Sequence, residues 1–424
     1  MEFKEYYLGE LCEIKSSKRI YAKDYVNKGI PFYRSKEIIE KSKGLDISQN
    51  LYIDNKKFEE IEEKHGIPET GDLLLTSVGT LGVPYIVKNE KFYFKDGNLT
   101  WFTNFKSLLN QYYLFYWFKS KEGIGEINRV TIGSTQKALT IKNLRYLKIT
   151  LPDKKNQFKI INLIQKIENK LENNKQVIAN LEELSQTLFK RWFVDFEFPD
   201  ENGNPYKSNG GEMVDSELGA IPKGWNVKNL DDIANYMNGL AMQKFKPTDN
   251  QNSLPVVKIK ELKNGSTDEN SNRCTSEIPE KALIVDGDII FSWSATLLVK
   301  MWCGGKAGLN QHLFKVSSDK YPKWFYYYWT KRYIDYFIGI ANDKATTMGH
   351  INRKHLSHAK ILTPNDQTLE KFSRTFDDLL EKELSVSKES KRLTELRDTL
   401  LPKLMSGEIE IPTDIEVNED ELSI

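Results

Sequence analysis

Two long stretches of the chain place apolar residues at alternating spacings of four and three, which is typical of helices that bury one face. The pattern predicts one helix across residues 160–192 and a second across residues 372–404. The apolar seam positions are Ile160, Ile164, Ile167, Leu171, Ile178, Leu181, Leu188 and Trp192 in the first helix, and Phe372, Phe376, Leu379, Val386, Leu393, Leu400 and Leu404 in the second.

Polar residues interrupt both seams, at Asn174 and Ser185 in the first and at Glu383, Ser390 and Arg397 in the second. The second stripe is weaker and indicates a need for a partner, so we expect the two helices to pair antiparallel as a coiled coil. Polar positions such as Asn174 and Ser390 would then fix the register at some loss of stability. The alternative is two surface helices on separate cores.

Paired helices of this length would set a fixed distance. At about 1.5 Å per residue, the span from Ile160 to Trp192 predicts a rod of roughly 50 Å. This length corresponds to on the order of one to one and a half turns of B-DNA. We expect the segments that precede the two helices to lie at opposite ends of the rod, related by a pseudo-twofold axis.

Each seam is preceded by short apolar runs separated by glycines and then by an aromatic-rich run, a rhythm of strands, turns and a helix. It predicts two α+β modules. The runs lie at residues 72–76, 84–87, 92–94 and 112–118 in the first module, and at 287–291, 299–303 and 324–328 in the second, with a glycine-rich turn at 304–308.

The two modules are copies of one plan. LRYLKITLP at Leu144–Pro152 recurs as LSHAKILTP at Leu356–Pro364, 212 residues later, and QYYLFYWFKS at Gln111–Ser120 recurs as KWFYYYWTKR at the same offset. We predict a first domain at residues 1–152, a central helix at 153–198, a linker at 199–215, a second domain at 216–364, a C-terminal helix at 365–411 and an acidic tail at 412–424.

The net charge of +1 hides an uneven distribution. Residues 1–152 contain 24 basic and 19 acidic residues, and residues 216–364 contain 20 basic and 14 acidic residues. The linker, the C-terminal helix and the tail are each acidic. A surplus of basic residues confined to the two modules favours a surface that follows phosphates.

Other sequence features limit the class of protein. No apolar run approaches the length of a membrane span, and the N-terminal residues lack the apolar core of a signal peptide. Cys12, Cys274 and Cys303 are few and widely separated, as expected for free thiols in a reducing compartment. We therefore expect a cytoplasmic protein.

Motifs of catalysis are missing from the sequence. The string Asn204-Pro205-Tyr206 lacks a proline of the adenine methyltransferase loop, and Gly304-Gly305-Lys306 lacks the hydroxyl residue of a phosphate-binding loop. The histidines form no HExxH motif, and nuclease-like ExK strings, such as Glu62–Lys64 and Glu389–Lys391, recur in a highly charged chain. We expect no catalytic residue, no metal site and no cofactor in this chain. The five histidines are His65, His312, His350, His355 and His358.

Several strings together resemble the specificity subunits of type I restriction-modification systems. DSELGAIPKGWNVKNLDDI at Asp215–Ile233 is similar to the start of the second target-recognition domain in that family. GDLLLTSVGTLG and DGDIIFSWSAT resemble its strand after a Gly-Asp turn. TLFKRWFVDFEFP at Thr187–Pro199 and LRDTLLPKLMSGEIEI at Leu396–Ile411 resemble the ends of its two spacer helices.

This resemblance implies a non-catalytic DNA reader. Each recognition domain would read one half of an asymmetric bipartite site, and the paired helices would fix the gap. Two methyltransferase subunits, which use S-adenosylmethionine, would dock around the helices, and motor-nuclease subunits using ATP and magnesium would join them. Ser77–Leu81 (SVGTL) differs from Trp293–Leu297 (WSATL), so the half-sites should differ too.

DNA contacts need side chains that read base edges or hold phosphates. The polar and basic residues of the loops meet this need. We predict DNA contacts by Arg34, Lys36, Ser77, Thr80, Lys95, Asn98, Thr131, Ser134, Thr135, Gln136 and Lys137 in the first module, and by Lys258, Lys260, Trp293, Ser294, Asn310, Gln311, His312, Thr346, Thr347, His350 and Asn352 in the second.

The sequence leaves one alternative from another class open. Two basic modules joined by helices would also suit a two-headed adaptor that binds protein or glycan. Sequence-specific duplex binding that requires methyltransferase subunits would favour the DNA reader.

Overall fold

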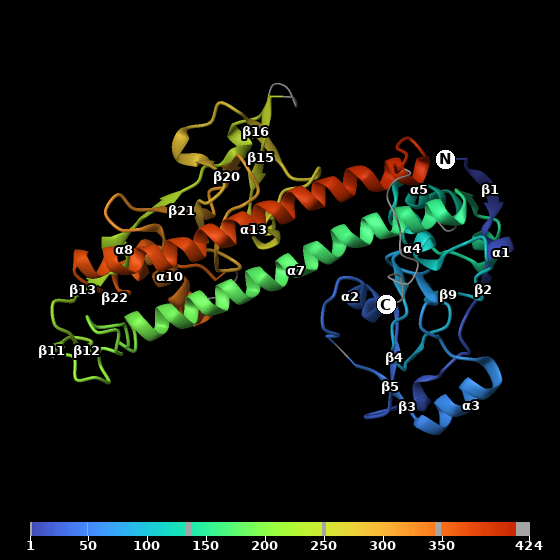
Figure 1. Cartoon of the computed structure of the whole chain (residues 1–424), viewed down its shortest axis with the longest axis horizontal. Coiled ribbons are helices and arrows are strands. Elements are labelled where there is room, and N and C mark those ends of the chain that lie inside the picture. Colours follow the sequence, from blue (N-terminus) through green and yellow to red (C-terminus); the bar gives the residue numbers. More distant parts are fainter. Residues whose placement is uncertain (1, 49, 132–136, 248–251, 344–348, 413–424) are drawn as a thin grey trace. The chain divides into compact units, whose positions relative to one another are not determined.

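The computed structural model describes residues 2–48, 50–131, 137–247, 252–343 and 349–412. The chain forms two compact units, of which unit 1 is Met1–Asn169 with Thr394–Ile424 and unit 2 is Lys170–Leu393. Each unit contains one α+β module and parts of two long helices (Figure 1). The acidic tail from residue 413 onward lies outside the described residues.

The two predicted long helices are confirmed. Helix α7 spans Lys154–Phe193 and helix α13 spans Asp366–Ser406, with 40 and 41 residues. Both begin before the first predicted seam residue, and residues of these first turns, such as Gln157 and Leu369, are already buried. None of the helices in the described part of the chain combines the length and apolar character of a membrane span.

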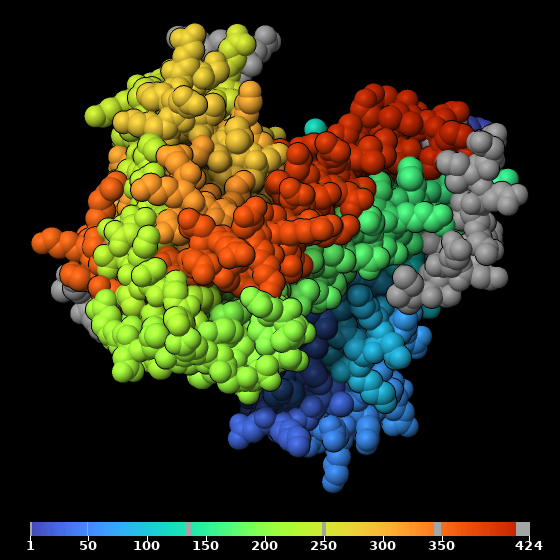
Figure 2. Space-filling model, turned by 60° about the vertical axis from the view of Figure 1, so that its left-hand side comes forward, coloured from blue at the N-terminus to red at the C-terminus, as the bar shows by residue number. Residues whose placement is uncertain are grey.

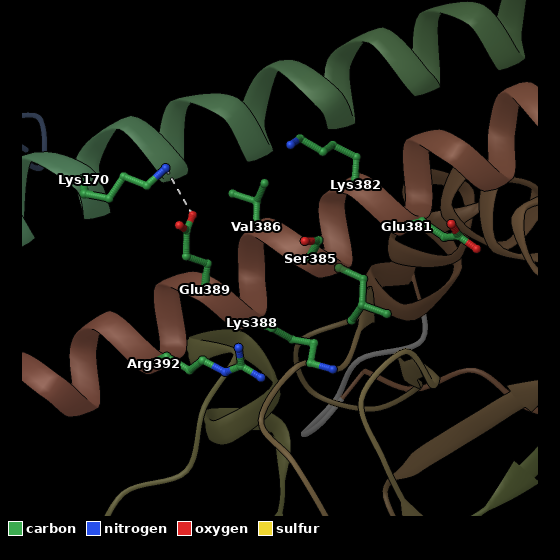
Figure 3. Close-up of a pocket in the computed structure, with 9 residues that line it drawn as sticks. Lys170, Glu381, Lys382, Ser385, Val386, Lys388, Glu389 and Arg392 are labelled. Atoms are coloured by element: carbon green, nitrogen blue, oxygen red, sulfur yellow. Dashed lines mark ion pairs between the residues drawn. The ribbon is translucent and has the colours of Figure 1, made fainter.

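Within unit 2 the two helices run antiparallel. Asn174 of α7 donates its side-chain N–H to Glu389 of α13 at 2.8 Å, while Trp192, further along α7, packs its ring 4.6 Å from Phe372, earlier in α13. Lys170 also lies 3.2 Å from Glu389, and this ion pair borders the polar groove between the helices in Figure 3. The buried Asn174 thus has a charged partner across the seam.

Within unit 1, the start of α7 packs on the end of α13. Ile160 and Ile164 share one buried core with Leu404 and Met405. Lys159 donates to the carbonyl oxygen of Pro412 at 3.0 Å. Each unit therefore contains both helices.

The elements of unit 1 outside the long helices are short. The strands are β1 Lys4–Tyr7, β2 Glu13–Lys15, β3 Tyr25–Val26, β4 Ile30–Tyr33, β5 Tyr52–Ile53, β6 Leu73–Thr76, β7 Pro84–Ile86, β8 Tyr93–Phe94, β9 Leu99–Thr103 and β10 Lys148–Leu151. The helices are α1 Leu8–Leu11, α2 Ser35–Ser42, α3 Asn55–His65, α4 Gln111–Lys119, α5 Lys121–Val130 and α6 Ile141–Arg145, with a 3₁₀ turn at Ala22–Asp24.

Unit 2 repeats most of these elements. The strands are β11 Met213–Ser216, β12 Gly219–Pro222, β13 Asn226–Asn229, β14 Asn235–Asn238, β15 Ser253–Val257, β16 Arg273–Thr275, β17 Leu283–Ile284, β18 Ile289–Ser292, β19 Leu298–Met301, β20 Ala307–Leu309, β21 Leu313–Ser317 and β22 Lys360–Thr363. The helices are α8 Leu230–Ile233, α9 Ile259–Asn264, α10 Lys323–Arg332, α11 Ile334–Asp343 and α12 Arg353–Ser357, with 3₁₀ turns at Met242–Lys244 and Glu280–Ala282.

The sheets show that the sequence repeat is a structural repeat. An antiparallel sheet has the order β2-β9-β6-β7 in unit 1 and β14-β21-β18-β19 in unit 2. A second sheet in each unit contains one parallel pair, β4 with β8 and β15 with β20. The two units thus share one α+β topology. The predicted glycine-rich turn at 304–308 extends into strand β20.

An aromatic helix joins each module to the long helices. In unit 2, Trp324 of α10 stacks on Phe376 of α13 with ring centres 4.5 Å apart, and Phe189 of α7 packs edge-on against Trp324. In unit 1, Tyr116 of α4 donates to Glu168 of α7 at 2.7 Å. Aromatic side chains bury large areas, so these contacts fix each module on its helix pair.

The linker that follows α7 packs on unit 2. Phe198 stacks between Tyr206 and Trp225, with ring centres 4.6 and 5.3 Å away. Lys371 of α13 donates to the carbonyl oxygen of Pro199 at 3.2 Å. Figure 2 shows this light green segment beside the orange part of α13.

One carboxyl group lies inside the helix seam. Glu383 of α13 is buried, with Glu182 of α7 and Lys331 of α10 as its charged neighbours, and Lys331 lies 3.2 Å from Glu182. Burial, reinforced by Glu182 and opposed by Lys331, raises the pKa of Glu383 to about 7. An ionised Glu383 is therefore unfavourable in the folded chain.

Replacing Glu383 by Gln should stabilise unit 2 above pH 7. Because its pKa is higher in the folded than in the unfolded chain, the stability linked to its protonation is complete below about pH 4.5 and lost as pH rises through 7. We expect E383Q to be more stable than the parent by roughly 1–3 kcal/mol at pH 8, with a smaller difference at pH 5.

Thermal unfolding of both full-length chains at several pH values measures this effect. E389Q is the matched control, because Asn174 and Lys170 hold the pKa of Glu389 below its usual value. A pH-independent difference between E383Q and the parent would contradict the assignment.

Candidate nucleic-acid interface

In unit 1, four loops predicted to contact DNA meet at one end of the two sheets. Ser35, at the start of α2, donates its hydroxyl to the carbonyl oxygen of Asn98 at 3.1 Å. The backbone N–H of Ser77 donates to the same carbonyl oxygen at 2.8 Å, and Leu139 donates to the carbonyl oxygen of Ser77 at 3.0 Å. Lys95 is joined by its backbone to Tyr33, the residue before Arg34. The structure thus brings these separate segments together.

The same frame recurs in unit 2. Ile351 donates to the carbonyl oxygen of Trp293 at 3.0 Å, as Leu139 does to Ser77. The backbone of Asn310 donates to Val257, the residue before Lys258, at 3.0 Å. Isolated bridges Val78 with Ala138 and Ser294 with His350 close the two frames in the same way.

The side chains on the two frames differ. Strand register pairs Thr76 with Leu99 and Ser292 with Leu313, so Ser77 and Asn98 correspond to Trp293 and His312. In unit 1 the buried Ser77 hydroxyl lies 2.7 Å from the Thr100 hydroxyl. In unit 2 the Trp293 ring packs against His312, Phe314 and His350, with ring centres 5.8, 5.7 and 6.4 Å away.

Two of the predicted basic residues begin a helix in equivalent positions. Arg34 caps α2 and Lys258 caps α9, and in each case the backbone N–H donates to a buried glutamate three residues on. The Arg34 guanidinium also donates to Glu37 at 2.6 Å. Burial favours the neutral acid, but the hydrogen bonds from Arg34 hold the pKa of Glu37 below its usual value. Arg34 is therefore largely engaged in positioning this loop.

A known protein family matches the chain over both modules. The family model for the type I restriction modification DNA specificity domain matches residues 1–183 and 222–395, which covers both modules. The chain belongs to this family. It is therefore a DNA-specificity subunit with two recognition domains and not a catalytic subunit, and it acts with DNA and with other subunits of a restriction-modification complex.

Named relatives agree with this family. The chain is 28% identical over 353 residues to the MjaIX specificity subunit of Methanocaldococcus jannaschii, covering 80% of this chain and 78% of the relative. It is 25% identical over 327 residues to the HindI specificity subunit of Haemophilus influenzae, covering 64% and 71%. The crystal structure of the S subunit from M. genitalium has a similar fold, with a TM-score of 0.56 and 16% identity over 95% of this chain and 96% of that chain.

The predicted contact residues differ in exposure. Ser77, Ser294 and Asn310 are buried, whereas Thr80, Gln311 and Asn352 are exposed. Three predicted contact residues already interact with neighbouring residues of the module. The Thr131 hydroxyl donates to the carbonyl oxygen of Ile127, and the Lys258 ammonium donates to the side chain of Asn272. Lys260 lies 3.5 Å from the carboxylate of Asp268. The others exposed are Lys36, Lys137, His312 and His350, while Ser134, Thr135, Gln136, Thr346 and Thr347 lie outside the described residues.

Sequence reasoning missed a basic groove beside the first frame. Arg19, Tyr21 and Tyr25 line a cavity of about 430 Å³ together with Arg34 and Lys95. Arg19 donates to Asp96 at 2.8 Å and remains 65% exposed, so its guanidinium is oriented and accessible. The string SSKRIYAKDY, in which basic and aromatic residues alternate, was the available signal.

In the second module Arg353 was missed. Its guanidinium carbon lies 5.9 Å from the centre of the Phe314 ring, and it donates to the carbonyl oxygen of Tyr236 at 2.8 Å. The basic string HINRKH at residues 350–355 was the available signal.

Ser77 and Thr80 should respond differently to alanine. S77A removes a buried hydroxyl that bonds to Thr100 and Leu75, so we expect a loss of stability of about 1–2 kcal/mol. T80A removes an exposed hydroxyl and should change stability by less than about 0.5 kcal/mol. Thermal unfolding of both full-length variants tests this contrast, which equal losses would refute.

Proposed function

We propose that each module reads one half of an asymmetric bipartite DNA site and that the paired helices set the gap between the halves. The repeated loop frame supports this proposal most directly. One backbone arrangement carries Ser77 and Asn98 in the first module and Trp293 and His312 in the second. Equal frames with different side chains suit two readers of unlike sequences, because base edges are discriminated by side chains.

The surplus of basic residues in both modules supports contact with the phosphate backbone. In the first module, the exposed Lys36 and Lys137 and the groove with Arg19 and Lys95 offer several cations on one set of loops. In the second, Lys260 and Arg353 are exposed near the equivalent loops. These residues would position the duplex, while Asn98, Gln311 and Asn352 would contact base edges.

We further propose that two adenine methyltransferase subunits dock around the paired helices and that motor-nuclease subunits join through them. In this assembly the methyltransferase subunits use S-adenosylmethionine and the motor-nuclease subunits use ATP with magnesium. This chain contributes recognition and spacing, and we place the complex in the cytoplasm. Membership of the specificity-subunit family supports a DNA reader over a two-headed adaptor for protein or glycan.

Removing polar contacts from one module should relax one half-site only. The double variant T80A/K137A changes two exposed residues on loops joined by the bridge between Val78 and Ala138. We expect methylation mapping of cells carrying the operon to show degenerate bases in one half of the site and an unchanged second half. K64A, which removes an exposed lysine on α3, is the control for loss of charge. Relaxation of both halves together would argue against one reader per module.

The gap should follow the length of the helices. We would insert four residues into α7 after Asn174 and four into α13 before Glu389, because these two residues face each other. Four helical residues add about 6 Å, which corresponds to on the order of one to two base pairs. Methylation mapping should then find both half-sites unchanged with a longer gap. A methylated site with the original gap would refute the ruler.

A further inference from the structure

The second module has an aromatic and imidazole centre where the first module has smaller side chains without rings. Trp293 replaces Ser77 on the shared frame, and His312 replaces Asn98. His350 replaces Ala138, because the two residues occupy equivalent bridges. Three substitutions of the same kind at three meeting points indicate one local change of chemistry.

The three side chains form a contiguous surface. The Trp293 ring is a neighbour of both imidazoles, with its centre 5.8 Å from that of His312 and 6.4 Å from that of His350. Phe314 supports the indole from β21 at 5.7 Å. Both histidines are exposed, whereas Trp293 is partly buried. The indole is thus a fixed platform and the imidazoles are its accessible edges.

Packing rather than hydrogen bonding holds this platform. The indole N–H of Trp293 is buried and has no acceptor among the residues that the structure describes. The Trp293 backbone is fixed instead, since its carbonyl oxygen accepts from Ile351 at 3.0 Å. Buried N–H groups without partners are rare and disfavour folding, so hydrogen bonding does not account for a tryptophan at this position.

Polar and charged groups flank the aromatic centre. Arg353, whose guanidinium is permanently charged, lies over the supporting Phe314 ring at 5.9 Å and donates to the carbonyl oxygen of Tyr236 at 2.8 Å. On the same loop as His312, Asn310 accepts the backbone N–H of His312 at 3.2 Å, and the Gln311 amide lies 3.3 Å from the His312 ring nitrogen. On β21, Lys315 is paired with Asp288 at 2.9 Å.

We propose that Trp293, His312 and His350 form one DNA-contacting centre in which two imidazoles bind acceptor groups of the second half-site as imidazolium ions. This inference rests on the proposed function. The acceptors are phosphate oxygens or the acceptor atoms of base edges, which share the same chemistry toward an N–H donor. The indole face stabilises the neighbouring cations.

A proton-dependent contact follows from this chemistry. Imidazole changes charge between pH 5 and 8, and a DNA anion favours the protonated form. Binding of the second half-site should therefore take up protons, while the equivalent contacts in the first module, Asn98 and Ala138, carry no titratable group. The two halves of one DNA site should respond differently to pH.

The experiment uses the full-length chain assembled with its methyltransferase subunits. The probe is the duplex whose bipartite site methylation mapping has defined, together with one duplex altered in each half. We expect binding of the intact duplex to strengthen by roughly tenfold from pH 8 to pH 6 at constant salt. The duplex whose second half is altered should lose most of this dependence, whereas the other altered duplex should keep it.

The variants H312Q and H350Q keep the size and polarity of the side chains but cannot become cations. Each should reduce the ratio of the affinities at pH 6 and pH 8 by several fold. The triple variant W293S/H312N/H350A, which installs the side chains of the first module, should abolish the pH dependence. H358Q, which replaces an exposed histidine of the same module outside the centre, is the matched control. Thermal unfolding at pH 8 checks that the variants remain folded.

The results separate the possible outcomes. If H312Q reduces the dependence of affinity on salt without changing the methylated sequence, the acceptors are phosphates; if the second half-site becomes degenerate, they are base edges. Sequence-specific binding with an unchanged pH dependence in both variants would overturn the centre but not the proposed function. The absence of any sequence-specific duplex binding would overturn both.

Discussion

The burial of aromatic side chains between a module and two antiparallel helices is the interaction on which the rest of the structure depends. In unit 2, Trp324 on α10 stacks on Phe376 of α13, and Phe189 and Phe193 of α7 pack around both rings. Neither long helix has enough apolar seam residues for a stable pair alone, since Asn174, Ser185 and Glu383 occupy buried seam positions. The module supplies the missing apolar surface and thereby fixes the helix register within its unit.

That dependence explains why recognition can vary while the framework is kept. The loops that carry Ser77 and Trp293 share backbone hydrogen bonds, such as those from Leu139 and Ile351, which do not depend on the identity of their own side chains. Different side chains at these points are therefore compatible with the same backbone frame. The two modules illustrate this freedom, because one frame holds a hydroxyl pair and the other an aromatic and imidazole centre.

The sequence predicted the elements better than it predicted the roles of single residues. The spacing of apolar residues located α7 and α13, and the glycine-bounded runs located β6 and β18. Phe189 and Phe193 were absent from the predicted seam, yet both pack against Phe376 of α13 and Trp324 of α10, because the module widens the buried face of α7. Arg34 has the chemistry of a base reader, yet the buried Glu37 engages its guanidinium. The sequence shows that Glu37 is three residues from Arg34. Only the backbone conformation at the start of α2 shows that the two side chains meet.

The sequence by itself determined the duplication, the two seams and the basic character of both modules, because repeats, periodicity and charge are properties of the order of residues. Only the tertiary structure decided which loops meet. Ser77, Asn98 and Leu139 are distant in sequence, and their contact depends on strand pairing, which no local pattern encodes. The same holds for Trp293, His312 and His350, whose proximity arises because β21 pairs with β18 and the segment at residues 349–351 adds to the end of that sheet.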